Sequence, residues 1–340
     1  MKRIGKFIAG RKTFIVLAAF LLLIPSALGF IATKVNYDIL SYLPDSLETV
    51  AGQDIMVDEF GMGAFSMVIV DGMEKKDVAA LEERIEAMDH VEKVLWYDDF
   101  VGIDVPVSMI PGAVADALFQ GDSTMMIALF DQTTSAETTM EAIEEMRAQV
   151  GQQCFISGMS GIVTDIKNLA MGEMPIYVMI AVVLSLIVLG LTMESFLVPL
   201  IFLLSIGIAI VYNMGTNSFL GDISYLTQAL AAVLQLGVTL DYSIFLLNNY
   251  EENKQRFEGD KERAMSHAIA NTFKSVVGSS ITTIAGFAAL CFMTFRLGLN
   301  IGVVMMKGVA IGVVCCVTLL PAMVLLFDKA IEKTRHKPLI

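Results

Sequence analysis

The sequence predicts a polytopic α-helical membrane protein with six transmembrane helices and one α+β domain between the first and the second. Hydrophobic residues make up 55% of the 340 residues and charged residues only 17%, with a mean hydropathy of +0.67. Soluble domains are about a quarter charged. Apolar runs of roughly the 20 residues needed to cross a bilayer lie at 13–31, 175–192, 196–214, 226–247, 277–295 and 300–326.

Basic residues gather in three places, which fall on one side of the membrane if the chain crosses it six times. They precede the first run, lie between the fourth and fifth runs, and follow the sixth. Because Lys and Arg of short loops are retained in the cytoplasm, we expect a multi-pass cell (plasma) membrane protein with both termini cytoplasmic. The net charge of −13 comes mostly from the extracytoplasmic segment, so it does not indicate a nucleic-acid partner.

The first apolar run also fits a cleaved signal peptide. Residues 14–24 are followed by the small residues Ser26, Ala27 and Gly29, as at a signal-peptide cleavage site. The apolar character continues through Phe30 and Ile31, which favours a retained first span.

The segment between the first two spans is expected to fold as one ferredoxin-like α+β domain. Two passages of similar length read strand, helix, strand: β-rich runs at 64–70 and 91–96 flank a helical pattern, and so do runs at 125–130 and 153–156. Two β-α-β passages are typical of the ferredoxin-like fold. A helix at 162–170 is expected to continue directly into the second span.

These patterns divide the chain into four parts. The predicted parts are a cytoplasmic N-terminus with the first span (1–32), an extracytoplasmic domain (33–173), a bundle of five spans (174–328) and a cytoplasmic tail or linker (329–340). Between the fourth and fifth spans, residues 252–275 are predicted to form an amphipathic helix on the inner membrane surface, with its basic side near anionic head groups.

A carboxylate with a phenol beside it, Asp241 and Tyr242, lies inside the fourth apolar run. A charge at the centre of a membrane helix costs about 3 kcal/mol or more, so such a residue normally faces protein or water. Gly237 precedes Asp241 by one turn on the same stripe and leaves room for a neighbouring helix. Asp241 is therefore a candidate proton or ion carrier. The alternative is a neutral Asp that hydrogen-bonds a neighbouring helix for packing alone.

Polar residues of the fifth and sixth runs are candidates to support Asp241. The hydroxyls of Ser279, Thr282 and Thr283 can bond a neighbouring helix, although such hydroxyls commonly bond back to carbonyls of their own helix. Lys307 lies about a third of the way into the sixth run. It can either snorkel to the outer interface or pair with a carboxylate.

The unit is expected to work as a pair. Small-residue stripes in the sixth run, Gly298-x3-Gly302 and Gly308-x3-Gly312, and the polar stripe of the fourth have too few partners in one six-span bundle. Tyr242 lies about 100° around the helix from Asp241. We therefore expect Tyr242 to reach the carboxylate on the facing fourth span of a second unit.

Residue patterns of an enzyme are not found in the sequence. The histidines His90, His267 and His336 are dispersed, and Gly158-Met159-Ser160-Gly161 does not have the spacing of a nucleophile elbow. Of four cysteines only Cys154 lies in the extracytoplasmic segment, which excludes a disulfide within that domain. The other three, in predicted spans, are expected to pack as small apolar residues. The sequence predicts neither catalysis nor a cofactor or metal.

Four motifs in order resemble the MMPL branch of the resistance-nodulation-division (RND) transporters. They are Val-Asn-Tyr-Asp-Ile-Leu-Ser-Tyr-Leu-Pro at 35–44, Gly-Val-Thr-Leu-Asp-Tyr-Ser-Ile-Phe-Leu-Leu at 237–247, Ser-Ser-Ile-Thr-Thr-Ile-Ala-Gly-Phe at 279–287, and Thr-Leu-Leu-Pro at 318–321. Members of this family typically carry two such units in one polypeptide and use proton-motive force to export lipids or other hydrophobic molecules.

The resemblance implies that Asp241 and Tyr242 are the family's intramembrane proton relay and that residues 45–172 are its porter domain. It implies membrane lipids, a hydrophobic substrate and a second RND-type unit as partners. The chain holds one unit, so we expect either half of a two-unit transporter or two copies that pair. The alternatives are a protein-export auxiliary on the same six-span unit, or a non-transporting sensor or scaffold in which Asp241 is structural.

Overall fold

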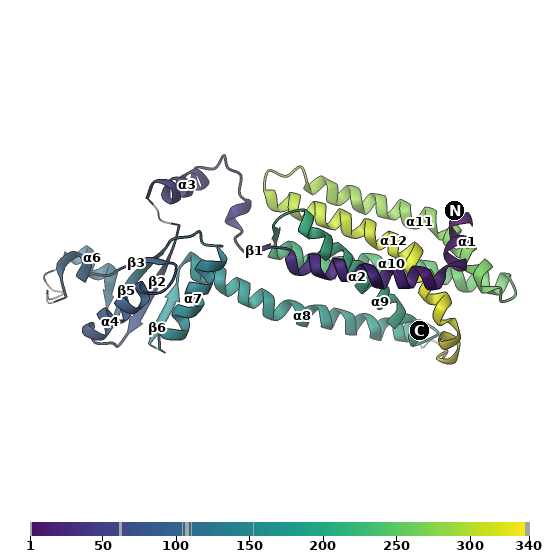
Figure 1. The fold of residues 1–340 in the computed structure, drawn as a ribbon, viewed down its shortest axis with the longest axis horizontal. Helices are drawn as coiled ribbons and strands as arrows, with labels where there is room; N and C mark the ends of the chain where they lie inside the picture. The colour runs from purple at the N-terminus through teal and green to yellow at the C-terminus, as the bar shows by residue number, and fades with distance from the viewer. Residues whose placement is uncertain are drawn as a thin grey trace. The chain divides into compact units, whose positions relative to one another are not determined.

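The computed structural model describes residues 2–60, 63–103, 105, 109, 111–151 and 153–336, which form two compact units. One unit is helical and comprises Met1–Asn36 with Gly172–Ile340, and the other is an α+β unit of Tyr37–Met171. Among the described residues, six helices are long and apolar enough to cross a membrane. They are α2 (Lys12–Ala32), α8 (Met159–Thr192), α9 (Leu197–Gly215), α10 (Tyr225–Arg256), α11 (Lys261–Leu290) and α12 (Arg296–Lys333) (Figure 1). The prediction of a polytopic helical membrane protein is confirmed.

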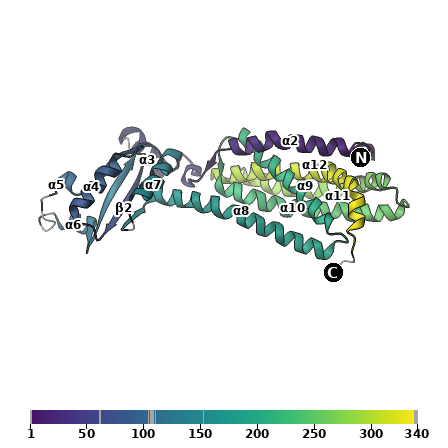
Figure 2. The same ribbon diagram turned by 60° about the horizontal axis from the view of Figure 1, so that its bottom comes forward.

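Helix α12 is the centre of the helical unit and contacts α2, α9, α10 and α11 (Figure 2). Of the most apolar part of each helix, 61% is buried in α12 but only 6% in α8 and 11% in α2 and α11. Cys315 and Cys316 lie in this core, as the sequence predicted. At one end, the short parallel strands β1 (Val35–Asn36) and β7 (Ile223–Ser224) pair.

The glycine stripes of α12 find their partners inside the unit, which corrects one argument for pairing. A Cβ on Gly302 would lie 2.7 Å from the Phe287 carbonyl oxygen of α11, and one on Gly308 would lie 2.5 Å from Asn213 Nδ2 of α9. These positions are therefore occupied by close helix contacts and are not free to receive a second unit.

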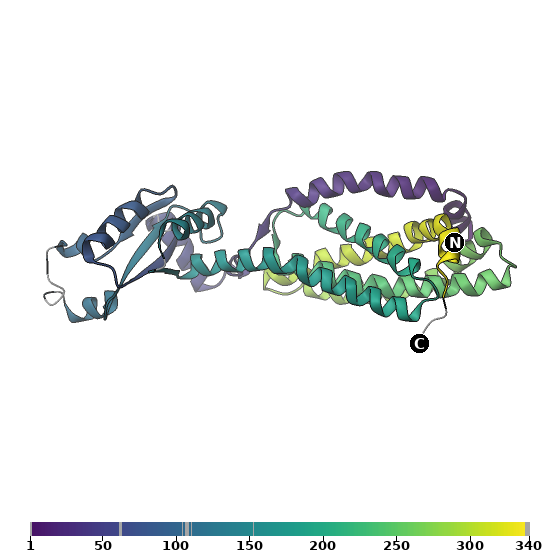
Figure 3. The same cartoon turned by 90° about the horizontal axis from the view of Figure 1, so that it is seen from below.

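The cytoplasmic amphipathic helix predicted at 252–275 is not a separate element. Residues 252–256 end α10, and residues 261–275 are the first half of α11, which continues to Leu290 (Figure 3). The apolar face of residues 261–275, with Met265, Ala268 and Ile269, is buried in the bundle core together with residues of α1 (Lys2–Gly10), the helix that precedes α2. A Cβ on Gly5 of α1 would lie 2.7 Å from the Ser266 carbonyl oxygen, so α1 and α11 are in close contact.

Two predicted boundaries also fall inside continuous helices. Helix α8 begins at Met159 and runs without interruption to Thr192, which confirms that the helix at 162–170 continues into the second span. The first residues of the predicted tail, 329–333, belong to α12. Residues 337–340 of that tail lie outside the described residues.

The α+β unit contains a sheet with the strand order β3-β5-β2-β6, in which all neighbours are antiparallel. This order, with α4 between β2 and β3 and α7 between β5 and β6, is that of the ferredoxin-like fold. The elements are α3 (Glu48–Phe60), β2 (Ala64–Asp71), α4 (Lys75–Glu86), β3 (Val91–Leu95), α5 (Asp98–Val101), α6 (Gly112–Leu118), β4 (Phe119–Gln120), β5 (Ser123–Phe130), α7 (Glu137–Gln149) and β6 (Cys154–Ser157), preceded by the 3-10 turn η1 (Leu40–Tyr42).

The core of this unit lies between the sheet and helices α4 and α7. Alternate residues of β5, Met126, Ala128 and Phe130, are completely buried, as expected for a strand with one covered face. Ile85 of α4 and Ile143 of α7 are buried in the same cluster. The apolar residues that alternate along the strands therefore pack in one core with those that recur at helical spacing in α4 and α7.

Candidate functional site

Asp241 lies on the outer face of α10. The exposed residues Gly237, Asp241, Phe245 and Asn248 follow one another at helical spacing, which places them on one stripe. In the part of the chain that the structure describes, the Asp241 carboxylate has no hydrogen bond and no ion pair. A carboxylate in this setting needs a protein partner or water, and the described residues of this unit do not supply the partner.

A cavity of about 400 Å³ opens beside Asp241, between α10 and α11. It is lined by Val238, Asp241, Tyr242, Phe245, Ser275, Val276, Ser279 and Thr283. The α11 wall therefore offers three hydroxyl groups opposite one carboxylate. Water or a hydrogen-bonding partner can enter a polar site of this size.

The hydroxyls of α11 bond mainly to their own helix. Thr282 and Thr283 donate to the Ser279 carbonyl oxygen over 2.7 Å and 3.1 Å. Of the two fates expected for these residues, the structure shows the local one. Ser279 and Thr283 line the cavity with Asp241, whereas Thr282 is exposed.

Tyr242 does not project from the outer face with Asp241. It is 6% exposed and packs in the bundle core, where its hydroxyl is buried without a hydrogen-bond partner among the described residues. Neighbouring helix positions are about 100° apart, so an outward Asp241 turns Tyr242 toward α11 and the core. The expectation that Tyr242 reaches a facing fourth span therefore differs from the structure.

Gly237 is open on the outer face. A Cβ at this position would meet no described atom within 4 Å. The space that the glycine leaves one turn before Asp241 is therefore on the outside of the unit, where another helix could approach.

Lys307 lies away from Asp241, at the end of α9. Its Nζ donates to the Asn213 carbonyl oxygen at 2.9 Å and to Asn217 Oδ1 at 2.5 Å. The last carbonyls of a helix have no intrahelical donor, so Lys307 satisfies the end of α9. Within the described ranges it has no carboxylate partner.

A buried polar pair, Asn213 and Gln235, was missed at the sequence level. Asn213 Nδ2 donates to Gln235 Oε1 over 2.9 Å, and both residues are completely buried. Asn213 Oδ1, Gln235 Nε2 and Thr239 Oγ1 are buried without partners among the described residues. The sequence does contain a pattern that marks this polar stripe: Gln235, Thr239 and Ser243 lie four residues apart and so share the inner face of α10.

Six helices of the described residues that are long and apolar enough to span a membrane, with a ferredoxin-like domain after the first of them, define a polytopic helical membrane protein. Residues 122–338 match the sequence profile of the MMPL family, which is more than half of the chain. The chain belongs to the MMPL family.

Named relatives are longer than this chain. The apo-petrobactin exporter of Bacillus anthracis is 23% identical over 361 residues, which covers 96% of this chain and 47% of the relative. The mycolic acid-containing lipids exporter MmpL11 of Mycolicibacterium smegmatis is 23% identical over 244 residues, 66% of this chain and 25% of the relative. SecDF of Thermus thermophilus superposes with a TM-score of 0.51 at 13% identity, over 94% of this chain and 38% of that chain, and shows a shared fold alone.

Proposed function

We propose that this chain is one unit of a proton-motive-force-driven exporter of lipids or other hydrophobic molecules, and that Asp241 carries the proton. The observation that carries the proposal is the Asp241 carboxylate on the outer face of α10, which has no partner among the described residues and lies beside a cavity with a polar α11 wall. Two MMPL relatives are named exporters, of apo-petrobactin and of mycolic acid-containing lipids. The likeness to SecDF concerns the fold, so it does not favour protein export.

A second unit is proposed to cover the Asp241 face. An acidic side chain that faces lipid without a partner is costly, and Gly237 leaves open space on the same face. The adjoining face of α11 is also exposed and small, with Ser275, Gly278 and Thr282. Small residues let membrane helices approach closely and bond one another. The second unit is either another copy of this chain or the other half of a longer polypeptide.

The proposed cycle requires the carboxylate to meet water from each side in turn. Asp241 takes up a proton from one compartment, the helices repack around the neutral side chain, and the proton leaves into the other compartment. Two states that differ in helix packing are biased in this way by one bound proton. Helix α8 is one continuous helix from Met159 to Thr192, and is therefore the proposed route by which repacking reaches the α+β unit.

The orientation is proposed from the basic residues, with both termini in the cytoplasm of the cell and the α+β unit outside. A cysteine at the exposed Asp122 tests it in a chain whose own Cys154 is changed to Ser. An impermeant thiol reagent is expected to label it from outside in whole cells. Labelling only after the cells are opened would show the opposite orientation.

The function is tested with Asp241→Asn, which keeps the size and hydrogen bonding of the side chain but cannot ionise. Proton flux is measured in proteoliposomes, with and without a second unit. It is expected to fall at least tenfold while insertion and folding are retained. Glu252→Gln is the matched control, because it removes a carboxylate from the same stripe beyond the apolar run. Transport by Asp241→Asn at the wild-type rate would leave Asp241 a structural residue.

A further inference from the structure

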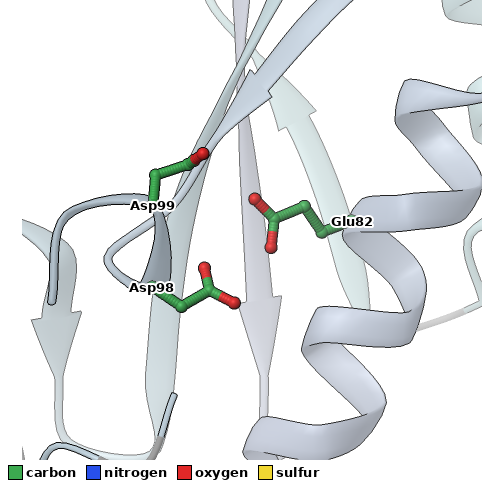
Figure 4. Close-up of side chains that lie close together, drawn as sticks. All are labelled: Glu82, Asp98 and Asp99. Atoms are coloured by element: carbon green, nitrogen blue, oxygen red, sulfur yellow. The ribbon is translucent and has the colours of Figure 1, made fainter. Parts of the chain in front are cut away.

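Three carboxylates converge at one edge of the α+β unit, far in sequence from the membrane helices. Glu82 comes from α4, and Asp98 and Asp99 begin α5. One oxygen from each of these residues lies within 4.8 Å of the others. Figure 4 shows that all three side chains point into the same space.

Glu82 is buried although no described Lys, Arg or His forms an ion pair with it. The residue is 8% exposed, and within the described residues no donor from outside the cluster bonds its carboxylate. Asp98 Oδ1 is also buried, again without a hydrogen-bond partner among the described residues. Burial of an ionised carboxylate costs several kcal/mol unless a charge or donor compensates.

Of the three carboxylates, Asp99 alone has partners outside the cluster among the described residues. Its Oδ2 accepts the Trp96 backbone N–H at 3.1 Å, and its Oδ1 pairs with Lys93 Nζ at 3.2 Å. Among the described residues, Lys93 is thus the one cation paired with the cluster, and it pairs with Asp99. Two negative charges at this edge are left without a counter-charge among the described residues.

The chain fixes the geometry of the cluster by ordinary packing. Glu82 shares the inner face of α4 with Val78, Leu81 and Ile85, each at most 1% exposed. After β3, the Tyr97 hydroxyl donates to the Ile103 carbonyl oxygen at 2.9 Å and holds the turn that carries Asp98 and Asp99. The carboxylates are thus brought together by the fold before any ligand arrives.

We propose that Glu82, Asp98 and Asp99 bind a hard divalent cation of the Ca²⁺ type. The ligand set consists of carboxylate oxygens without His or Cys, which suits Ca²⁺ and not Zn²⁺ or Cu²⁺. Ca²⁺ takes six to eight oxygens, so three carboxylates, some of them bidentate, leave room for waters. Sites with few protein ligands, as in extracellular modules, bind Ca²⁺ at roughly 10⁻⁴–10⁻³ M. Binding would tie α4 to the turn after β3.

A shared proton is the competing account of the same cluster. Two carboxyl groups can lie close if one keeps a proton and donates it to the other. That account predicts no cation-dependent change in the protein, so direct detection of a bound ion decides between the two.

The experiment uses Tb³⁺, an oxygen-seeking ion that replaces Ca²⁺ and luminesces when an excited tryptophan lies beside it. Trp96 is the one tryptophan of the chain and lies two residues before Asp98. The full-length protein in detergent is titrated with Tb³⁺ under excitation of tryptophan. Saturable emission is expected at sub-millimolar Tb³⁺, and millimolar CaCl₂ is expected to remove at least half of it.

Two near-isosteric variants and one control complete the test. Glu82→Gln and Asp98→Asn are each expected to weaken Tb³⁺ binding at least fivefold. Glu83→Gln, an exposed neighbour on α4, is expected to bind as the wild type does. If the wild-type protein gives no saturable emission, or if Glu82→Gln and Asp98→Asn bind Tb³⁺ like Glu83→Gln, the proposed site is wrong. Both outcomes leave proton transport through Asp241 untouched.

Discussion

Gly312 of α12 and Thr239 of α10 are in direct contact, since a Cβ on Gly312 would come within 2.6 Å of Thr239 Oγ1. One turn earlier, Gly308 stands in the same relation to Gln235, with a Cβ-to-Oε1 separation of 3.0 Å. The inner polar stripe of α10 is therefore accommodated by glycines on the central helix. Close approach of two membrane helices through glycine is a recurrent packing mode.

Gly312→Ala is expected to destabilise the helical unit, because the added methyl group has no space against Thr239. Overpacking of a well-packed core costs about 1–3 kcal/mol. Thermal unfolding in mild detergent measures it. Gly207→Ala in α9 is the control, since a Cβ there meets no described atom within 4 Å and the change favours a helix by about 1 kcal/mol.

The contact between Gly312 and Thr239 can also be tested with a second substitution that removes the steric clash. Thr239→Ala removes the hydroxyl that the new methyl group would strike, and that hydroxyl has no partner among the described residues. The double variant Gly312→Ala, Thr239→Ala is expected to regain most of the lost stability. If the two effects simply add, the contact is not the cause.

Tyr242→Phe is expected to separate stability from transport. The Tyr242 hydroxyl is buried without a hydrogen bond among the described residues. Because its removal breaks no hydrogen bond, the free energy of unfolding is expected to change by less than about 1 kcal/mol. If the hydroxyl serves the proposed proton path, proton flux falls while the melting temperature holds. A variant that loses flux and stability together would point to packing alone.

Much of the fold could be predicted because its signals are local. The six apolar runs, the two β-α-β passages and the helix that begins before the second span each follow from composition and period. The prediction of a separate surface helix at 252–275 was wrong because it depends on tertiary packing. An amphipathic face shows that something covers it, but the sequence does not tell whether lipid or α1 does so.

The residues of the candidate site could be predicted from the sequence, but the direction in which the side chains of α10 point could not. Asp241 and its neighbours on α11 stand out as polar residues in apolar runs, and Ser279 and Thr283 do line its cavity. Which face of α10 turns outward depends on the fit of Gly308 and Gly312 to the polar stripe, which no single helix reveals. Glu82 and Asp98 are brought together only by the fold, so the acidic cluster had no motif to mark it.

Asp328→Asn is expected to loosen the end of the bundle where α10, α11 and α12 meet. The Asp328 side chain is 6% exposed, accepts the Tyr250 hydroxyl at 3.2 Å and pairs with Lys254 and Lys261. Removal of one partner from a buried ion pair costs about 3–5 kcal/mol, and the exposure of Lys261 reduces this to about 2 kcal/mol. Thermal unfolding measures the loss, and Glu332→Gln, which is more exposed, should matter less.

Glu82→Gln is expected to stabilise the α+β unit increasingly as the pH rises, when EDTA keeps divalent cations away. Burial and the neighbouring charges of Asp98 and Asp99 raise the pKa of Glu82 to about 8, from 4.5 in an ordinary carboxyl group. The folded state therefore holds this proton more tightly than the unfolded state does. The resulting penalty is absent below about pH 4.5 and grows between pH 4.5 and pH 8. Melting curves at pH 5 and pH 8 should show a small gain for Glu82→Gln at the lower pH and a larger one at the higher. A gain independent of pH would mean that Glu82 does not hold a proton in the folded protein.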